Sequence, residues 1–376
     1  MNKVYNTVWN ESTEMWVVTS ELTRKGGRRP RQIRRTALAG LIAGLLLPSA
    51  PALATDYKNQ TLESGGTSSS MSLSAGDTAT NTTINRLGYQ YVSSGGSATS
   101  TTINSGGQQH VSSGGSATST TINSGGLQYV SSGGSATGTT INSGGQQRVS
   151  SGGSATSTTI NGGGQQHVSS GGSATGTTIN SGGNQNVFSG GSATGTTINR
   201  LGYQYVSSGG SATGTTINSG GQQRVSSGGS ATSTTINSGG MLSVSSGGSA
   251  VDITQNSGGA IVANTSAVLS GTNGKGTFSI AGGSASNMLL ENGGYLSVLN
   301  GHQATSTTIN SGGLQHVNGG GSATSTTINS GGLQWVYGSA TSTTIYSGGQ
   351  QWVSGSATST TINSGGEQWV SGSATS

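Results

Sequence analysis

A 19-residue repeat constrains the fold of this chain more than any other feature of its sequence. Isoleucine and valine each recur nine times at this spacing. The two columns are Ile84, Ile103, Ile122, Ile141, Ile160, Ile179, Ile198, Ile217, Ile236 and Val92, Val111, Val130, Val149, Val168, Val187, Val206, Val225, Val244. One unit of this length cannot bury its own apolar residues. The units must therefore stack, which is typical of a solenoid.

Composition argues against two other classes of glycine-rich protein, collagen and charge-rich disordered chains. Glycine accounts for 70 of the 376 residues but proline for only 3, and no G-X-Y period is present, so collagen is excluded. Charged residues make up 6% of the chain, whereas disordered chains are usually rich in charge. A flexible Gly/Ser chain is the remaining alternative, but such a chain would not keep isoleucine and valine in register.

The basic isoelectric point comes from the N-terminus alone. Residues 1–54 hold eight Lys and Arg against three Glu, whereas residues 55–376 hold six basic and six acidic residues. The long C-terminal part is therefore close to neutral. We expect no nucleic-acid partner, and electrostatic repulsion between copies would be weak.

Residues 1–54 have the pattern of a secretory leader. A basic region, Arg24 to Arg35, precedes an apolar run from Ala37 to Leu47, which is too short to span a membrane. Ala52-Leu53-Ala54 then provides a cleavage site after Ala54. The exported chain contains no cysteine, so its stability must come from stacking rather than from disulfides.

Each repeat contains two segments with the composition of β-strands. In one unit these are Thr99–Ile103 and Gln108–Val111, separated by Asn-Ser-Gly-Gly and Ser-Ser-Gly-Gly corners. Glycine at the corners permits the positive φ that sharp turns require. Two or three short strands per coil, stacked in parallel, predict an all-β fold, a right-handed parallel β-helix (solenoid) of 19-residue coils.

Comparison of the repeats predicts which side chains face inward. The position of His110 holds Tyr, Arg, Asn or Ser in other copies, so this column should face solvent. Strand alternation then turns Gln109 and Val111 inward. The glutamine position is unbroken over eight repeats: Gln90, Gln109, Gln128, Gln147, Gln166, Gln185, Gln204 and Gln223. Stacked at ~4.8 Å, these amides can bond to one another along the axis.

The repeat pattern divides the chain into segments. They are a leader (1–54), an N-terminal cap (55–80), nine regular coils (81–249), irregular β-helix coils (250–302), and resumed repeats with a 19-residue and then a 17-residue period (303–376). The shorter period is seen at Val336, Val353 and Val370, and the Ser-Ser-Gly-Gly corner should supply the two deleted residues.

Nothing in the sequence predicts catalysis or a cofactor. The six acidic residues of the exported part share no spacing, whereas β-helical polysaccharide-cleaving enzymes need clustered carboxylates. His110 and His167 lie three coils apart, roughly 14 Å, which is too far to bind one metal ion. We therefore expect neither an enzyme nor a metal site.

Two surfaces are candidates for interactions. One is a dense row of hydroxyls, illustrated in two successive coils by Thr99, Ser100, Thr101, Thr102, Thr118, Ser119, Thr120 and Thr121. It could be a plain strand face, a face that bonds another copy, or an acceptor surface for O-linked sugar. The other is an aromatic ladder, Trp335, Trp352 and Trp369, which could stack on sugars or on another rod, or only on itself.

The leader and the repeat together resemble the AIDA-type self-associating autotransporter adhesins. The residues that carry the resemblance are Met1–Leu22, similar to the extended signal peptides of type V secretion, and the Ser105–Gly115 type of repeat. The resemblance implies a β-helical passenger at the cell surface that mediates adhesion, autoaggregation and biofilm formation. It also implies heptose on repeat hydroxyls from a cytoplasmic heptosyltransferase, and a host-cell or surface glycan as receptor. Such proteins end in an outer-membrane β-barrel, which this sequence lacks, so we expect a fragment, a truncated gene product or a passenger missing its anchor.

Several hypotheses for function therefore stand side by side. The first is an adhesin whose rods associate through many weak contacts along the axis. The second is a passive stalk that presents another domain. A third, the ice-binding solenoid, is suggested by the Thr99-x-Thr101 spacing, and the extended leader argues against it.

Overall fold

The computed structural model describes residues 5–10, 15–20 and 53–376, in two units divided between Ala52 and Leu53. In the first unit, strands β1 (Tyr5–Asn10) and β2 (Met15–Ser20) pair antiparallel. The basic and apolar parts of the predicted leader, up to residue 52, lie outside the described residues. The described residues contain strands and turns, and none of them form a helix capable of crossing a membrane.

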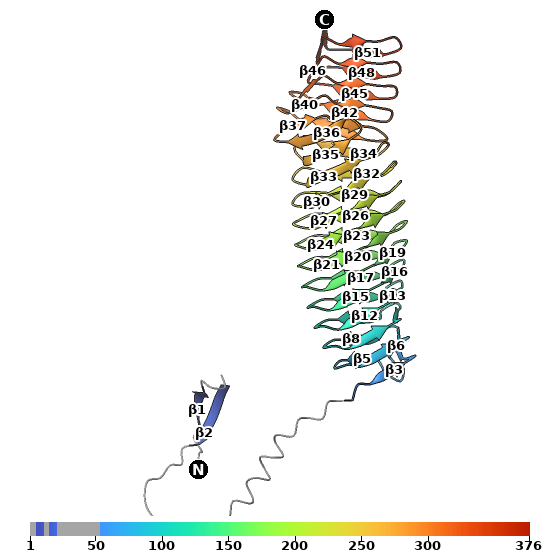
Figure 1. Ribbon diagram of the computed structural model, residues 1–376, viewed down its shortest axis with the longest axis vertical. Helices are drawn as coiled ribbons and strands as arrows, with labels where there is room; N and C mark the ends of the chain where they lie inside the picture. Colours follow the sequence, from blue (N-terminus) through green and yellow to red (C-terminus); the bar gives the residue numbers. More distant parts are fainter. Residues whose placement is uncertain (1–4, 11–14, 21–52) are drawn as a thin grey trace, which may run out of the picture. The chain divides into compact units, whose positions relative to one another are not determined.

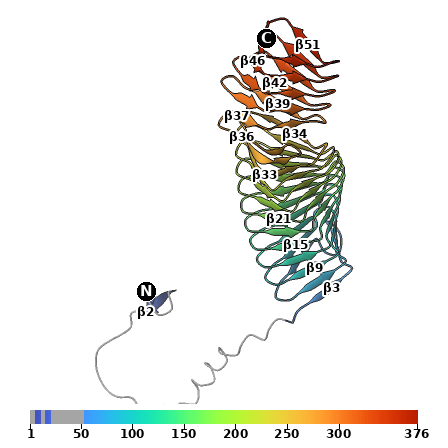
Figure 2. The ribbon, with the colours of Figure 1, turned by 45° about the horizontal axis from the view of Figure 1, so that its top comes forward.

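The second unit is a parallel β-helix, as predicted, with three short strands in each coil (Figures 1 and 2). In one coil these are β9 (Ser97–Thr99), β10 (Thr102–Ile103) and β11 (Gln108–Val111). Each strand pairs in parallel with its counterpart one repeat further along the chain. The third strand of each coil forms a sheet of 16 strands, from β5 (Ser70–Leu73) to β51 (Glu367–Val370).

Glycine and serine form the corners because the backbone there turns with positive φ. Ser100 separates β9 from β10 with φ 57°, and Gly114 in the Ser-Ser-Gly-Gly corner has φ 78°. The next glycine, Gly115, lies against the coil below, where a Cβ atom would collide with the carbonyl oxygen of Val92. The first glycine is thus selected by its conformation and the second by close packing.

The core of each regular coil consists of five inward side chains. Ile103, Val111 and Gln109 face inward and are fully buried, which confirms the sequence prediction. Ala98 and Thr101 also face inward. The interior is therefore narrow and alternates between apolar columns and polar columns of identical residues.

The buried glutamines of the regular coils form a ladder, and the side chain of Gln147 shows its full set of hydrogen bonds. Gln147 Nε2 donates to Gln128 Oε1 at 2.7 Å and to the Thr139 hydroxyl at 3.2 Å. Its Oε1 accepts from Gln166 Nε2 at 2.7 Å and from the Thr158 hydroxyl at 3.3 Å. Thr139 and Thr158 thus each join two glutamines, and a polar network of this kind can be buried without an orphaned group.

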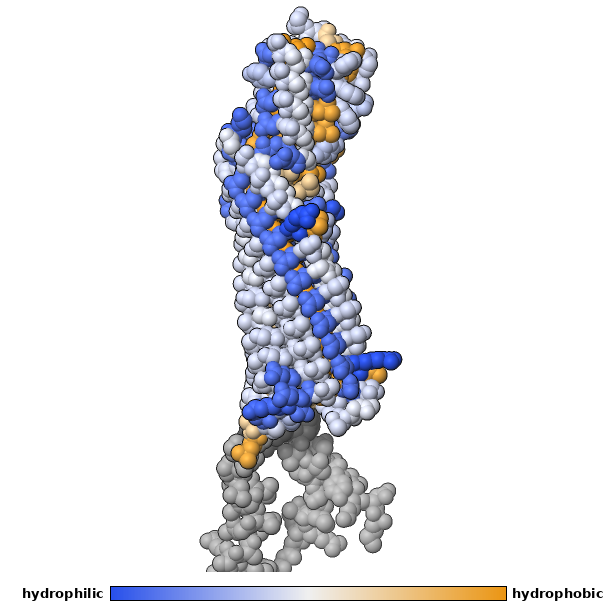
Figure 3. Space-filling view, turned by 90° about the vertical axis from the view of Figure 1, so that its right-hand side faces the viewer, coloured by the Kyte–Doolittle hydropathy of each residue, from blue (hydrophilic) through white to orange (hydrophobic). Residues whose placement is uncertain are grey.

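A second amide ladder runs along the corner after the second strand of each coil. From Asn256 down to Asn104, each Nδ2 donates to the Oδ1 of the asparagine one coil below, and a hydrophilic stripe climbs this side of the rod in Figure 3. Asn85 donates to a carboxylate oxygen of Glu63 at 2.8 Å. The ladder restarts with Asn310, which donates to Glu291 at 3.1 Å. Both runs of asparagines therefore begin on a carboxylate, a group that only accepts hydrogen bonds.

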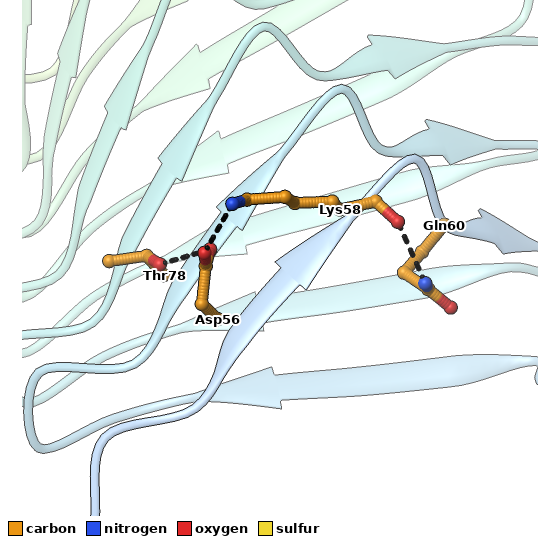
Figure 4. Close-up of polar contacts among 4 residues, drawn as sticks. All are labelled: Asp56, Lys58, Gln60 and Thr78. Carbon is orange, nitrogen blue, oxygen red and sulfur yellow. Dashed lines mark hydrogen bonds and ion pairs between the residues drawn. The ribbon is translucent and has the colours of Figure 1, made fainter.

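Residues 55–80, predicted to be a cap, form a coil that pairs with the regular array. Strand β3 (Asp56–Lys58) pairs in parallel with β6 (Thr78–Thr80), and β6 pairs in parallel with β9 of the regular array. Asp56 accepts a hydrogen bond from Thr78 at 2.8 Å and pairs with Lys58 at 3.0 Å (Figure 4). These two contacts hold the pKa of the Asp56 carboxyl below its usual value.

The irregular segment departs from the prediction of simply altered coils. Strands β35 (Val268–Asn273), β36 (Gly276–Ala281) and β37 (Ser284–Ser286) form an antiparallel meander, visible as a widening of the rod in Figure 1. The parallel stack continues past it, because β34 (Ala260–Asn264) pairs directly with β39 (Tyr295–Val298). The segment between β34 and β39, residues 265–294, is thus an insertion into one side of the β-helix, and it contains the meander.

The last coils are shorter than the regular ones. Ser322 pairs with Ser339, and Ser339 pairs with Ser356, so the period here is two residues shorter than in the regular array. Only Tyr337 and Gly338 connect β45 (Leu333–Val336) to β46 (Ser339–Thr341). The four-residue corner has been reduced to two residues while the three strands are retained.

Candidate functional site

The outward faces of the first two strands in each coil form a regular array of hydroxyls. Ser97 and Thr99 point outward on β9, Ser100 projects from the corner, and Thr102 points outward on β10. Ser116 and Thr118 of the next coil pair in register with Ser97 and Thr99. Hydroxyls therefore repeat at ~4.8 Å along the axis and about 6.6 Å across each Ser-Ala-Thr strand.

The structure divides the predicted hydroxyl residues into two groups. Six lie on the outer surface: Thr99, Ser100, Thr102, Thr118, Ser119 and Thr121. The other two, Thr101 and Thr120, are each 1% exposed, and the Thr101 hydroxyl donates to Gln90 Oε1 at 3.2 Å. The prediction is therefore wrong for these two threonines, since they belong to the core network and not to the surface.

Two features of the sequence could have shown this. Thr101 lies two residues before the buried Ile103, so strand alternation places both side chains on one face. Alternation from Ala98 also identifies Ser97, which belongs to the outward array and which the sequence analysis misses. The inward position of Thr101 also corrects the ice-binding hypothesis, because Thr99 and Thr101 do not share a face.

The variable column on the third strand faces outward, as predicted, but its members contact one another. His110 stacks between Tyr91 and Tyr129, with ring centroids 5.2 and 4.8 Å apart. The guanidinium of Arg148 lies 5.7 Å from the centre of the Tyr129 ring. Partial burial lowers the pKa of His110, and it lowers that of His167 together with the nearby charge of Arg148. No cluster of metal-binding side chains occurs among the described residues.

The three tryptophans of the candidate ladder occupy equivalent positions on neighbouring strands. Trp335, Trp352 and Trp369 are paired along successive coils. The first two rings contact each other, with centroids 6.4 Å apart and planes tilted by 36°. Trp352 and Trp369 are 49% and 61% exposed and line a hollow of about 260 Å³. Part of the ladder thus packs on itself, while its outer two rings offer an aromatic surface.

Two known protein families match this chain, one in the N-terminal leader and one in the repeats. Residues 1–50 match the extended signal peptide of the type V secretion system, which confirms the predicted leader. Residues 103–145, 141–183, 179–221 and 270–332 match the family described as "adhesin of bacterial autotransporter system, probable stalk".

Individual relatives agree with this assignment. The chain is 87% identical over 93 residues to the autotransporter CRAC of Citrobacter rodentium, and 78% identical over 92 residues to the autotransporter adhesin/invasin TibA of Escherichia coli. These matches cover 25% and 24% of this chain but only 6% and 9% of the two relatives. The crystal structure of a TibA fragment hyper-glycosylated by TibC is 49% identical, with a TM-score of 0.50. The match covers 86% of this chain and all of that fragment.

Proposed function

We propose that this chain, which belongs to the AIDA-type autotransporter adhesins, is a cell-surface passenger through which bacteria adhere to one another and to other surfaces. The observation that carries the proposal is the outward hydroxyl array, repeated in register along the rod. One hydroxyl contact is weak. Many such contacts, repeated at a fixed spacing on two parallel rods, act together and give useful avidity.

The same hydroxyls are the proposed acceptors of O-linked heptose. The structurally similar TibA fragment is glycosylated by TibC, and serine and threonine are the main outward residues on the first two strands of the regular coils here. A sugar on Thr99 or Ser100 would project into solvent, whereas a sugar on Thr101 would have to enter a filled core. We therefore assign modification to the outward positions only.

Display on non-aggregating bacteria tests the proposal. The chain is fused ahead of an autotransporter translocation unit and expressed with and without a heptosyltransferase, and settling of cells and binding to epithelial cells are followed. Settling or adherence that depends on display supports the adhesin. Absence of both, with surface exposure confirmed by antibody, would contradict it.

A matched pair of variants isolates the hydroxyls. The outward threonines of eight coils are changed to valine in one variant and to serine in the other: Thr99, Thr118, Thr137, Thr156, Thr175, Thr194, Thr213 and Thr232. Valine retains the branched shape and removes the hydroxyl, whereas serine retains the hydroxyl. Settling should fall for the valine variant and remain at the parent level for the serine variant.

A passive stalk is the second candidate function. It is favoured by the family description, which names a probable stalk, and by a core of identical columns that repeats over the regular coils. A stalk predicts normal display with no settling in either variant, with or without the heptosyltransferase.

A further inference from the structure

We infer that a hollow beside the meander binds the ring of a neutral saccharide. The hollow has a volume of about 640 Å³, within the range of ~300–1,000 Å³ usual for small-molecule sites. Its lining includes Asp252, Ser270, Ser279, Ser286 and Asn287. It lies where the repeating array is interrupted, so its residues differ from those of every regular coil.

A β-bulge places the carboxylate. The pairing of β33 (Ser249–Gln255) with β35 shifts register between Ala250 and Ile253, and Asp252 lies in this bulge with φ 57°. The Ser233 hydroxyl donates to Asp252 Oδ2 at 2.6 Å and thereby orients the carboxylate. No protein donor to the other oxygen is found among the described residues, so that oxygen can accept from a ligand.

The meander adds a row of hydroxyls beside this carboxylate. Ser279 pairs across the strands with Ser270 on one side and Ser286 on the other. The three side chains alternate with the buried Leu269, Ile280 and Ala285, so they point outward. Neighbouring strands are ~4.8 Å apart, so the three serines form a line of hydroxyl donors and acceptors along one side of the hollow.

Asn287 contributes an acceptor at the end of this row. Its Nδ2 donates to the carbonyl oxygen of Thr277 at 3.1 Å, and its backbone is held with φ 53°. This bond orients the amide through one of its two N–H groups, and Oδ1 is left as an acceptor. Phe278 is only 3% exposed and packs in the core below, which gives this patch a firm base.

The chemistry of the lining selects the class of ligand. Sugar hydroxyls both donate and accept, and the hollow offers a carboxylate and an amide oxygen as acceptors together with serine and threonine hydroxyls. No Lys or Arg lines it, and the Asp252 charge disfavours phosphates and acidic sugars. No metal-binding cluster occurs among the described residues, so recognition rests on hydrogen bonds to an uncharged ring.

Two sources could supply such a ring: a glycan on another surface, or the O-linked heptose on a second copy of this rod. The exported chain is tested in one arm against a printed panel of neutral and sialylated glycans. In a second arm it is tested against an immobilised copy of the chain that carries heptose. Binding in the first arm alone identifies an external glycan. Binding in the second alone identifies the sugar of a partner rod.

Three variants test the site in both arms. Ser279→Tyr fills the hollow from a solvent-facing position, and Ser211→Tyr makes the same change on the regular strand β27 (Ser211–Thr213) as a control. Asp252→Asn removes the charge, and asparagine tolerates the positive φ at this position, so folding should be unaffected. Binding should be lost with Ser279→Tyr, weakened at least about tenfold with Asp252→Asn, and unchanged with Ser211→Tyr.

The inference is overturned if neither arm shows binding of a neutral sugar, or if Ser279→Tyr binds as the parent chain does. This result is separate from the proposed function. Cells that settle normally with Ser279→Tyr would retain the adhesin and exclude the hollow from its mechanism. Loss of settling with the valine variant alone would not bear on whether the hollow binds a sugar.

Discussion

The side-chain nitrogen of Gln147 lies 2.7 Å from the side-chain oxygen of Gln128 in the coil below, and both residues are fully buried. The same contact repeats from coil to coil over the regular array. The interior of the rod is therefore held by hydrogen bonds as well as by apolar packing. Its outer hydroxyls are then free for contacts with other molecules.

Interrupting this ladder should be more destabilising than trimming its end. Gln147→Leu removes the acceptor for Gln166 Nε2 in the coil above. Gln223→Leu removes no acceptor for a glutamine, because Leu242 occupies the position above Gln223. Leucine fits the column in both places. Urea denaturation should show Gln147→Leu to be less stable than Gln223→Leu by about 1–3 kcal/mol. Equal stabilities would contradict the role of the ladder.

The carboxylate at the start of the second run of asparagines should not tolerate an amide. Glu291 accepts from the backbone nitrogen of Gly258 at 2.6 Å and from Asn310 at 3.1 Å. In Glu291→Gln one of these donors would face the new NH₂ group, at a cost of about 1–3 kcal/mol. Glu63→Gln is the control, since only Asn85 donates to Glu63 among the described side chains. A thermal unfolding midpoint that drops equally in both variants would contradict this view.

The two glycines of one corner should respond differently to substitution. Gly115→Ala places a methyl group against the Val92 carbonyl oxygen and should destabilise the rod by about 1–3 kcal/mol or more. Gly114 has open space at its Cβ and φ 78°, which asparagine can adopt. Gly114→Asn should therefore be nearly neutral in the same denaturation experiment. A larger effect for Gly114→Asn would show that packing does not select the second glycine.

Mild acid should weaken the rod through its half-buried histidines. Burial lowers the pKa of His110 in the folded state below its ordinary value of 6.5, so the unfolded chain binds the proton more readily. The stabilisation is therefore complete above about pH 6.5 and is lost as the pH falls below it.

Denaturation at pH 7.5 and pH 5 measures this effect. His110→Tyr and His167→Asn, combined, install residues that occupy the same column elsewhere and should reduce the loss at pH 5. Asp56 remains ionised at pH 5, because its pKa lies below the ordinary 3.8. An identical loss in the parent chain and the double variant would rule out the histidines as its source.

The regular part of the rod can be predicted from the sequence because identical residues at a fixed spacing imply identical environments. This reasoning, together with strand alternation, places Ile103, Gln109 and Val111 correctly in the core. It fails for Thr101 because a hydroxyl suggests a surface position, although the Thr101 column is as constant as that of the glutamine it contacts. The asparagine ladder escapes prediction for a related reason, since Asn104 has the appearance of a turn residue only.

The meander could not be predicted because its residues have no counterpart in the other coils. Asp252, Ser279 and Asn287 are brought together by a bulge and by two reversals of chain direction. Strand-like segments in 250–302 indicate β-structure but not the direction of pairing. The hollow is therefore a product of tertiary structure, whereas the hydroxyl array follows from the repeat itself.

Mapping of O-linked sugars on the displayed chain tests most directly whether the outward hydroxyls are the functional surface. The chain is expressed with a heptosyltransferase, recovered from the surface of adherent cells, and sequenced by mass spectrometry. Modification is expected at outward positions such as Thr99, Ser100, Thr118 and Ser119, with Thr101 and Thr120 unmodified. Heptose on Thr101 and Thr120 of surface-exposed, folded chains would contradict the arrangement described here.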